Sequence, residues 1–195
     1  MRLPSITPDE LSPAQRELYD RFEAMVADDA YSGFEVKRPD GAYTGPWGVL
    51  IHFPGLAGAL GRFVDLAQQL PGLSERERQV VILTIGARLG SAYELYAHQA
   101  LAARAGLRPD QIATLCAGGR PPGLSTGEAL AADVASCLAR GGVLPGPLYD
   151  TAVATLGQDT LDAIVFVTIH YLAIGILLNA YDVEAGPRIA QTETA

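Results

Sequence analysis

Glu94 and His98 lie in the segment Tyr93-Glu94-Leu95-Tyr96-Ala97-His98, four residues apart. This spacing brings two side chains to the same face of a helix. A carboxylate beside an imidazole can orient the ring, fix its tautomer and raise its pKa, which is the minimal equipment of a general acid-base pair. The same spacing is also common in solvated pairs that only stabilise a helix, so the residues alone leave both interpretations open.

The elements that would position this pair are helices. Ser12, Ser74 and Ser125 are each followed three residues later by Gln or Glu, which is the sequence pattern of a helix capping box. No segment shows the alternation of a strand, apart from short ambiguous runs such as residues 49–53. We therefore expect an all-α fold, with helices over residues 13–28, 54–70, 75–89, 92–105, 109–117, 126–140, 147–156 and 160–181.

Residues 29–48 are rich in Gly and Pro and have no sustained period, so we expect a long loop there. Long loops in compact domains often carry function. Lys37 and Arg38, together with Tyr43 and Trp47, lead us to expect that this loop discriminates an anionic substrate. The expected organisation is a single globular domain whose parts are residues 1–44 (helix and loop), 45–186 (helical domain) and 187–195 (polar tail).

Composition excludes several classes of protein. The chain has 195 residues, of which 49% are hydrophobic, and it carries 14 Lys and Arg against 22 Asp and Glu. A net charge of −8 without a basic patch argues against nucleic acid as a partner. Cys116 and Cys137 have neither zinc-site nor disulfide spacing, and the N-terminus lacks the apolar region of a signal peptide. We therefore expect a cytoplasmic protein.

Residues 163–180 are apolar enough to raise the question of a membrane span. Acidic residues flank the segment on both sides, and no Lys or Arg lies close enough to act as an anchor. We therefore expect a buried helix and no membrane. A helix that is apolar all round in so small a chain indicates burial by another subunit, which predicts a homo-oligomer.

A family resemblance adds to this interpretation. The run LSERERQVVILTIGARLGSAYELYAHQALAARAGL, residues 73–107, resembles the core helical hairpin of the carboxymuconolactone decarboxylase family, which shares its fold with the alkylhydroperoxidase D proteins. GPWGVLIHFPGLAGAL (residues 45–60) and HYLAIGILLNAYDVE (residues 170–184) resemble its flanking segments. The resemblance implies an alkylhydroperoxidase D-like helical fold and trimers or multiples of trimers.

The chain departs from the peroxidase branch of this fold. That branch carries two reactive thiols in the pattern CxxCxxxH, and the corresponding residues here are Ser91 and Glu94. A serine cannot form a thiolate or a disulfide, and Cys116 and Cys137 lie outside the motif. The family also often has Arg-Glu where this chain has Arg-Gln, so a proton relay through a glutamate at position 79 is not predicted. The missing thiols favour the decarboxylase-like branch.

The resemblance implies a cofactor-independent carbon-carbon lyase. His98 would move a proton at a carbon next to an enol or lactone system while Glu94 holds and polarises it, giving decarboxylation or isomerisation of a small carboxylated ring compound. We expect no cofactor and no metal. Two alternatives stay open, an alkylhydroperoxidase-like antioxidant protein and a non-catalytic oligomeric binding protein. The residues expected to bind the small-molecule substrate, or otherwise to pack in the core, are His52, Tyr93, Trp47, His170 and Tyr171.

Overall fold

The structure, a computed structural model, describes residues 1–27, 31 and 33–187. This part of the chain is helical and has no strand, so the expected all-α fold is confirmed. Each of the eight helices predicted from the sequence is present, with ends within two residues of the prediction. The α-helices are α1 (Pro13–Val26), α2 (Gly45–Leu50), α3 (Pro54–Gln68), α4 (Glu75–Leu89), α5 (Ala92–Arg104), α6 (Pro109–Cys116), α7 (Thr126–Leu138), α8 (Gly146–Leu156) and α9 (Gln158–Ala180).

The predicted capping boxes fix the starts of three helices. Ser12, Ser74 and Ser125 each accept a hydrogen bond from the third residue of the following helix, whose Gln or Glu side chain returns to the backbone of the serine. Helix α4 ends at Gly90, which has a left-handed backbone (φ 62°) and so allows the chain to reverse directly into α5. The expected helical hairpin is therefore formed by α4 and α5.

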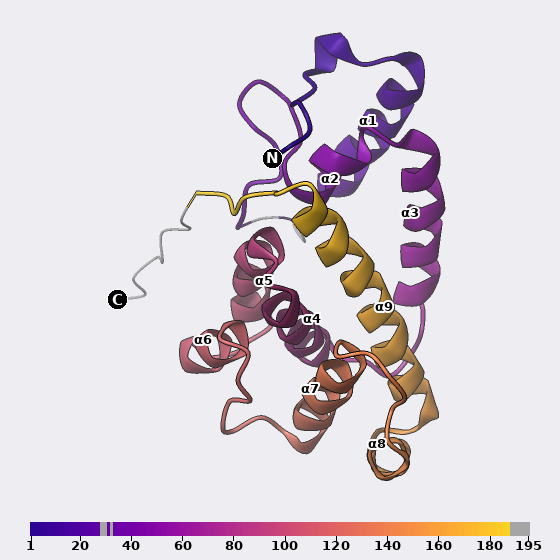
Figure 1. Ribbon diagram of the computed structural model, residues 1–195, viewed down its shortest axis with the longest axis vertical. Helices are drawn as coiled ribbons and strands as arrows, with labels where there is room; N and C mark the ends of the chain where they lie inside the picture. The colour runs from indigo at the N-terminus through magenta and orange to yellow at the C-terminus, as the bar shows by residue number, and fades with distance from the viewer. Residues whose placement is uncertain (28–30, 32, 188–195) are drawn as a thin grey trace.

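Helix α4 occupies the centre of the lower half of the molecule in Figure 1, where α5, α7 and α9 surround it. Its side chains are buried from Gln79 to Leu83 and again at Ile85. Ile82 and Ile85 pack with Val134 of α7 and Ile164 of α9 in the main hydrophobic core. A helix buried on every side provides a rigid support for the side chains that it carries.

One helix was missed. Residues 45–50 form α2, whereas the sequence predicted a loop as far as residue 48 and an ambiguous run beyond it. Pro46 occupies the first turn, where its fixed φ favours a helix start. Gly45 has φ 59°, and a Cβ at this position would overlap the ring of Tyr93. Tertiary contact with α5 therefore sets the beginning of this short helix.

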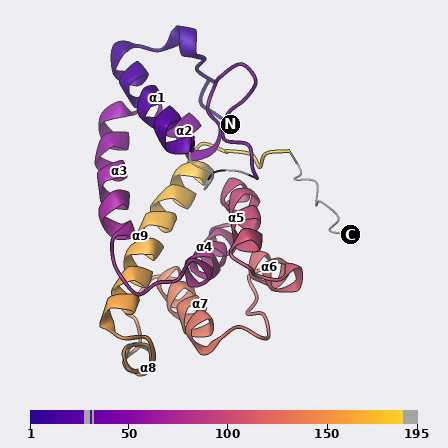
Figure 2. The ribbon, with the colours of Figure 1, turned by 180° about the vertical axis from the view of Figure 1, so that it is seen from behind.

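Helices α2 and α3 lie against one side of α9, with α1 packed on α3, and α4 of the α4–α5 hairpin lies against the other side (Figures 1 and 2). Residue 28, the expected end of the first helix, and residues 188–195 of the expected polar tail lie outside the described residues. The expected division at residues 44 and 186 stays a prediction.

Helix α9 is long and apolar enough to cross a membrane, judged by length and composition only, and it is the one such helix in the described residues. It has 23 residues, and its most apolar window of 18 residues has a mean hydropathy of 2.2. Only 44% of its most apolar window is buried within the chain, so burial on most sides is not achieved by one copy. Phe166, Ile169 and Ile176 are exposed on its outer face.

Candidate active site

A cleft of about 700 Å³ lies between α3 and the α4–α5 hairpin, with α9 contributing the wall between them. Helices α1 and α2 close one end of the cleft, and the first residues of α4 line the other end. The cleft brings together most of the candidate residues from the sequence. Those that line it are Trp47, Tyr93, Glu94, His98, His170 and Tyr171.

His52 does not line the cleft, so its expected role in substrate binding is not supported. It lies in the turn between α2 and α3, and this position directs the ring towards the N-terminal segment. Its Nε2 atom is 3.0 Å from the carbonyl oxygen of Pro4. The histidine therefore tethers the N-terminus to the turn.

The cations of the loop are also outside the cleft. Lys37 donates a hydrogen bond of 2.7 Å to Glu23 of α1, and Tyr43 donates another to the same carboxylate at 2.6 Å. Arg38 pairs with Asp40 at 3.4 Å. The expectation that these loop residues discriminate an anionic substrate is wrong. Neighbouring carboxylates already neutralise Lys37 and Arg38, and of the four expected loop residues only Trp47 lines the cleft.

His98 is held by α4 and not by its neighbour on α5. Its Nδ1 atom is 2.9 Å from Oε1 of Gln79, and Nε2 of the same amide donates to Glu75 at 2.6 Å. Because the amide nitrogen faces the Glu75 carboxylate, the amide oxygen must face His98. Nδ1 therefore carries the ring proton, and Nε2 is left with a lone pair. This is the tautomer of a general base.

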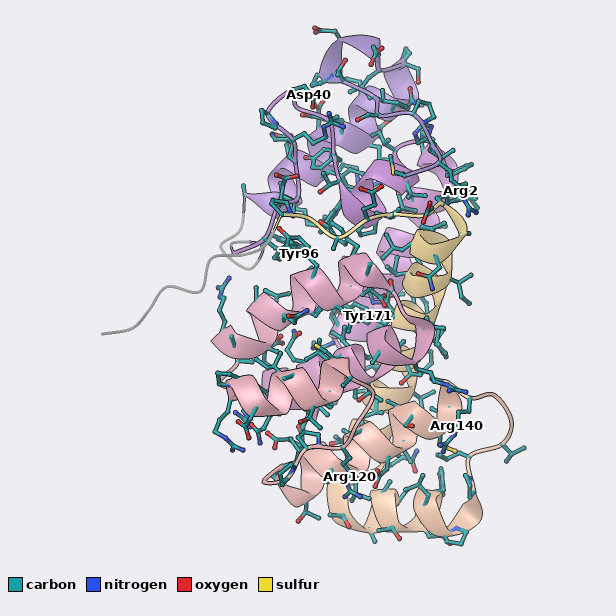
Figure 3. All side chains as sticks on the ribbon, turned by 60° about the vertical axis from the view of Figure 1, so that its left-hand side comes forward. Arg2, Asp40, Tyr96, Arg120, Arg140 and Tyr171 are labelled. Carbon is teal, nitrogen blue, oxygen red and sulfur yellow. The ribbon has the colours of Figure 1, made fainter. Side chains whose placement is uncertain are left out.

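The surroundings of His98 keep it neutral. Burial lowers its pKa to about 3, and nearby His170 contributes in the same direction. The ring of Tyr171 packs edge-on against that of His98, with 5.0 Å between the centroids. Figure 3 shows Tyr171 in the interior, between α9 and the hairpin. Burial also lowers the pKa of His170 to about 4, helped by the positive charge of Arg78.

Glu94 is not hydrogen-bonded to His98, which corrects the expectation that it orients the imidazole. It is only 3% exposed, and neither carboxylate oxygen has a hydrogen-bond partner among the described residues. Burial raises its pKa to about 8, against a smaller opposing effect of Ser91. The side chain is therefore largely a neutral carboxylic acid at pH 7, with a proton to donate into the cleft.

Gly175 of α9 makes room for this carboxyl group, because a Cβ at this position would lie 3.0 Å from Oε2 of Glu94. The sequence alone did not connect this glycine with the site. The signal was weak, because a single glycine inside a helix says only that another group approaches closely.

The comparison with protein families agrees with the geometry. Residues 54–136 match the model of the Carboxymuconolactone decarboxylase family, and this stretch runs from α3 into α7 and contains Gln79, Glu94 and His98. These residues form a carboxymuconolactone decarboxylase family domain. The all-helical structure is consistent with the alkylhydroperoxidase D-like fold of that family. The comparison with curated proteins gives no match.

The carboxymuconolactone decarboxylase family contains both decarboxylases and peroxidases, so the position of the thiols matters. Cys116 ends α6 and Cys137 is in α7, and neither lines the cleft. Both are unpaired. Burial raises the pKa of Cys116 to about 11, which leaves almost no thiolate at pH 7.

Arg78 is a cleft residue that the sequence analysis did not single out as a candidate. Its side chain is only 19% exposed, and its ion pair with the exposed Glu75 joins Nε and Oε2 at 3.5 Å. The sequence offered one signal, its position directly before Gln79 in the Arg-Gln pair. Arg78 gives this end of the cleft a cation.

Tyr93 and Tyr96 use their hydroxyl groups to hold the loop that precedes α2. The Tyr93 hydroxyl donates to the carbonyl of Glu35 at 2.8 Å, and the Tyr96 hydroxyl accepts from the amide of Glu35 at 2.8 Å. Figure 3 labels Tyr96 beside this loop. Tyr93 thus offers the cleft its ring and not its hydroxyl. Within the described residues, no group of three or more His, Cys, Asp or Glu is placed to hold a metal ion.

Proposed function

We propose that this protein is a cofactor-independent acid-base enzyme, a carboxymuconolactone decarboxylase-like carbon-carbon lyase or isomerase acting on a carboxylated lactone or ring compound. One observation carries the proposal: the cleft pairs a neutral imidazole whose Nε2 holds a lone pair with a buried carboxylic acid that has no hydrogen-bond partner among the described residues. Environments that drive two titratable groups apart in this way assign the base and the acid. Here His98 is the base and Glu94 is the acid.

A decarboxylation requires only the acid of this pair. The bond between the ring carbon and the carboxyl carbon breaks, carbon dioxide leaves, and the electron pair moves into the adjacent enol or lactone system. Glu94 then gives its proton to the ring carbon and regains one from water. A preorganised donor next to the developing negative charge supplies much of the stabilisation in reactions of this type.

The same two groups support an isomerisation. His98 Nε2 takes a proton from the carbon next to a carbonyl, Glu94 donates a hydrogen bond to the enolate oxygen, and the imidazolium returns the proton to a different carbon. A carboxylic acid kept neutral by its surroundings is suited to donate a hydrogen bond to an enolate oxygen, as in ketosteroid isomerase. Both reactions require only side chains that line the cleft.

The alternative, thiol-based peroxide reduction, finds less support. Ser91 is fully buried at the position of one family thiol, Glu94 occupies the position of the other, and the two cysteines of the chain lie away from the cleft. A thiol with a raised pKa is a poor nucleophile at neutral pH. The non-catalytic alternative leaves a costly buried acid beside the cleft without a purpose.

The test is solvent exchange in deuterium oxide. A panel of enol-lactone and 2-oxo carboxylic acids is incubated with the protein, and deuterium uptake and carbon dioxide release are followed by NMR. We expect the wild type and a Cys116→Ser, Cys137→Ser double variant to act equally, and a Glu94→Ala variant to lose the reaction. Turnover of peroxide by the wild type that disappears in the double variant would instead establish the thiol chemistry.

We also propose that the protein forms a homo-oligomer through α9 and α3. Phe166, Ile169, Ala173 and Ile176 are exposed on α9 at spacings of three, four and three residues, which is the seam pattern of helices that pair side by side. On the adjacent α3, Leu56 and Leu66 are exposed as well. An apolar surface of this kind on a soluble chain marks an interaction site.

The expected consequence is that Ile169→Glu combined with Ile176→Glu converts the oligomer to a monomer. Two charges in an apolar seam are expensive to desolvate, so the association should be lost. Sedimentation velocity measures the change. Val143→Glu is the matched control, because Val143 is 91% exposed outside this surface, and it should leave the mass unchanged. A monomeric wild type would refute the proposal.

A further inference from the structure

The cleft is much larger than a small ring compound needs. Its volume is about 700 Å³, whereas an apolar protein cavity of about 150 Å³ suffices to bind benzene. One small ring would therefore fill only about a fifth of the space. The chemistry proposed above uses one part of the cleft, and the rest is left for some other part of the ligand.

The two ends of the cleft differ in polarity. Along α9, the lining residues are His170 and Tyr171 at one end and Ile174 and Leu178 at the other. Leu178 follows His170 by eight positions, which correspond to about 12 Å of helix. At the apolar end, α1 and α2 contribute only uncharged side chains, among them Met25, which is partly exposed at the rim. The cleft is thus an apolar channel with a polar head.

The polar head carries a cation suited to an ionised carboxylate. Arg78 lines the cleft, and its ion pair with Glu75 engages Nε, so its Nη groups are left to bind the oxygens of a ligand. The positive charge of Arg78 acts to lower the pKa of both His170 and Tyr171, which line the head of the cleft. Gln79 and His98 lie next to it, so a carboxylate held by Arg78 would place adjacent atoms at the proposed base.

We propose that the ligand of this cleft is an amphipathic carboxylate about 12 Å long, with its ionised head on Arg78 and an apolar chain or ring system along Ile174 and Leu178. For the reaction at the head, this inference rests on the proposed acid-base function. For binding, it rests on the shape and polarity of the cleft alone.

The test uses unbranched carboxylates as probes and calorimetry as the measurement. Hexanoate, octanoate and decanoate are titrated into the wild-type protein, and primary alcohols of the same lengths serve as probes without a charge. We expect the dissociation constant of the carboxylates to fall by about threefold to fourfold for each added methylene. The alcohols should bind more weakly and show the same dependence on length.

Two variants separate the head from the channel. Arg78→Gln should weaken all three carboxylates by about tenfold or more and leave the alcohols unaffected, because only the charge-assisted contact is lost. Leu60→Trp places a large ring in the channel, and it should weaken decanoate by at least tenfold while sparing hexanoate. Arg62→Trp is the matched control, because Arg62 is on the same helix but exposed, and it belongs neither to the cleft nor to the apolar surface of α3.

Failure of this inference differs from failure of the proposed function. If the affinity of the carboxylates does not depend on chain length, or if Leu60→Trp and Arg62→Trp behave alike, the channel does not hold an apolar group and the inference is overturned. Those outcomes leave deuterium exchange on small ring acids intact. Conversely, Glu94→Gln should bind decanoate like the wild type even where it has lost the reaction.

Discussion

Replacing His98 by Gln should lower kcat/KM for isomerisation by about 100-fold to 10,000-fold, which is the usual contribution of a positioned general base. The Gln79 amide fixes the proton on Nδ1 and thereby leaves Nε2 as the proton acceptor of the cleft. A glutamine at position 98 can still pack and form hydrogen bonds, but it cannot accept a proton near neutral pH. Steady-state kinetics measure the loss, and urea unfolding checks that the variant is folded.

Gln79 provides the control that distinguishes a base from a structural histidine. We expect Gln79→Leu to lower kcat by about tenfold with little change in KM, because Nδ1 loses its acceptor and the ring is no longer held in one tautomer. Gln79→Glu should restore most of this loss. It should also move the acid limb of the pH-rate profile to higher pH, since a carboxylate next to Nδ1 raises the pKa of His98 from about 3.

Two results would contradict this assignment. If Gln79→Leu changes stability without lowering kcat, Gln79 serves packing only. If His98→Gln keeps full activity while remaining folded, the base is a different residue, and His170 would be the next to test because it also lines the cleft and is also neutral.

The second large effect is expected at Glu94, in both activity and stability. If the carboxylic acid donates its proton in the reaction, kcat/KM should fall above pH 8, where Glu94 becomes a carboxylate. Glu94→Gln should lose this basic limb. It should abolish decarboxylation, which needs the proton, and keep part of the isomerisation, which needs only a hydrogen-bond donor. Profiles from pH 5 to 9.5 measure the difference.

The raised pKa of Glu94 also makes the free energy of unfolding depend on pH. The pKa of Glu94 is raised from 4.5 in the unfolded chain to about 8 in the folded one, so its contribution to stability is complete below pH 4.5 and is lost as the pH rises from 4.5 to 8. His98 and His170 act oppositely, because their lowered pKa values cost stability as the pH falls below 6.5. We therefore expect maximum stability near pH 6.5 and a decline of about 1.5 kcal/mol by pH 8.

Urea unfolding of Glu94→Gln at pH 6.5 and pH 8 tests this expectation, since the variant should not show the decline. Glu128 is the matched control, because it is also a buried glutamate but pairs with Arg76 at 2.6 Å. Its pKa is lowered by that arginine and by Ser125, so Glu128→Gln should destabilise the protein at pH 8. An equal decline in the wild type and in Glu94→Gln would show that Glu94 ionises normally.

The sequence by itself determined the helices. Capping serines, helix-breaking glycines and apolar periodicity act within one or two turns of chain, so the starts at Ser74 and Ser125 and the stop at Gly90 could be predicted. Helix α2 could not, because Gly45 is held by the ring of Tyr93, which lies far away in the sequence. Local signals predict local structure, and contacts between distant segments do not appear in them.

For the site, the sequence determined that Glu94 and His98 share a face of α5, and it named most of the residues around them. Only the tertiary structure decided what these residues do. Gln79, on another helix, fixes the tautomer of His98. Burial beside Gly175 raises the pKa of Glu94 and so keeps it protonated. The tertiary structure also decided which cations are available to a ligand. Lys37 and Arg38 are neutralised by nearby carboxylates, whereas Arg78 lines the cleft. Protonation and charge depend on burial and on partners, which only the assembled helices supply.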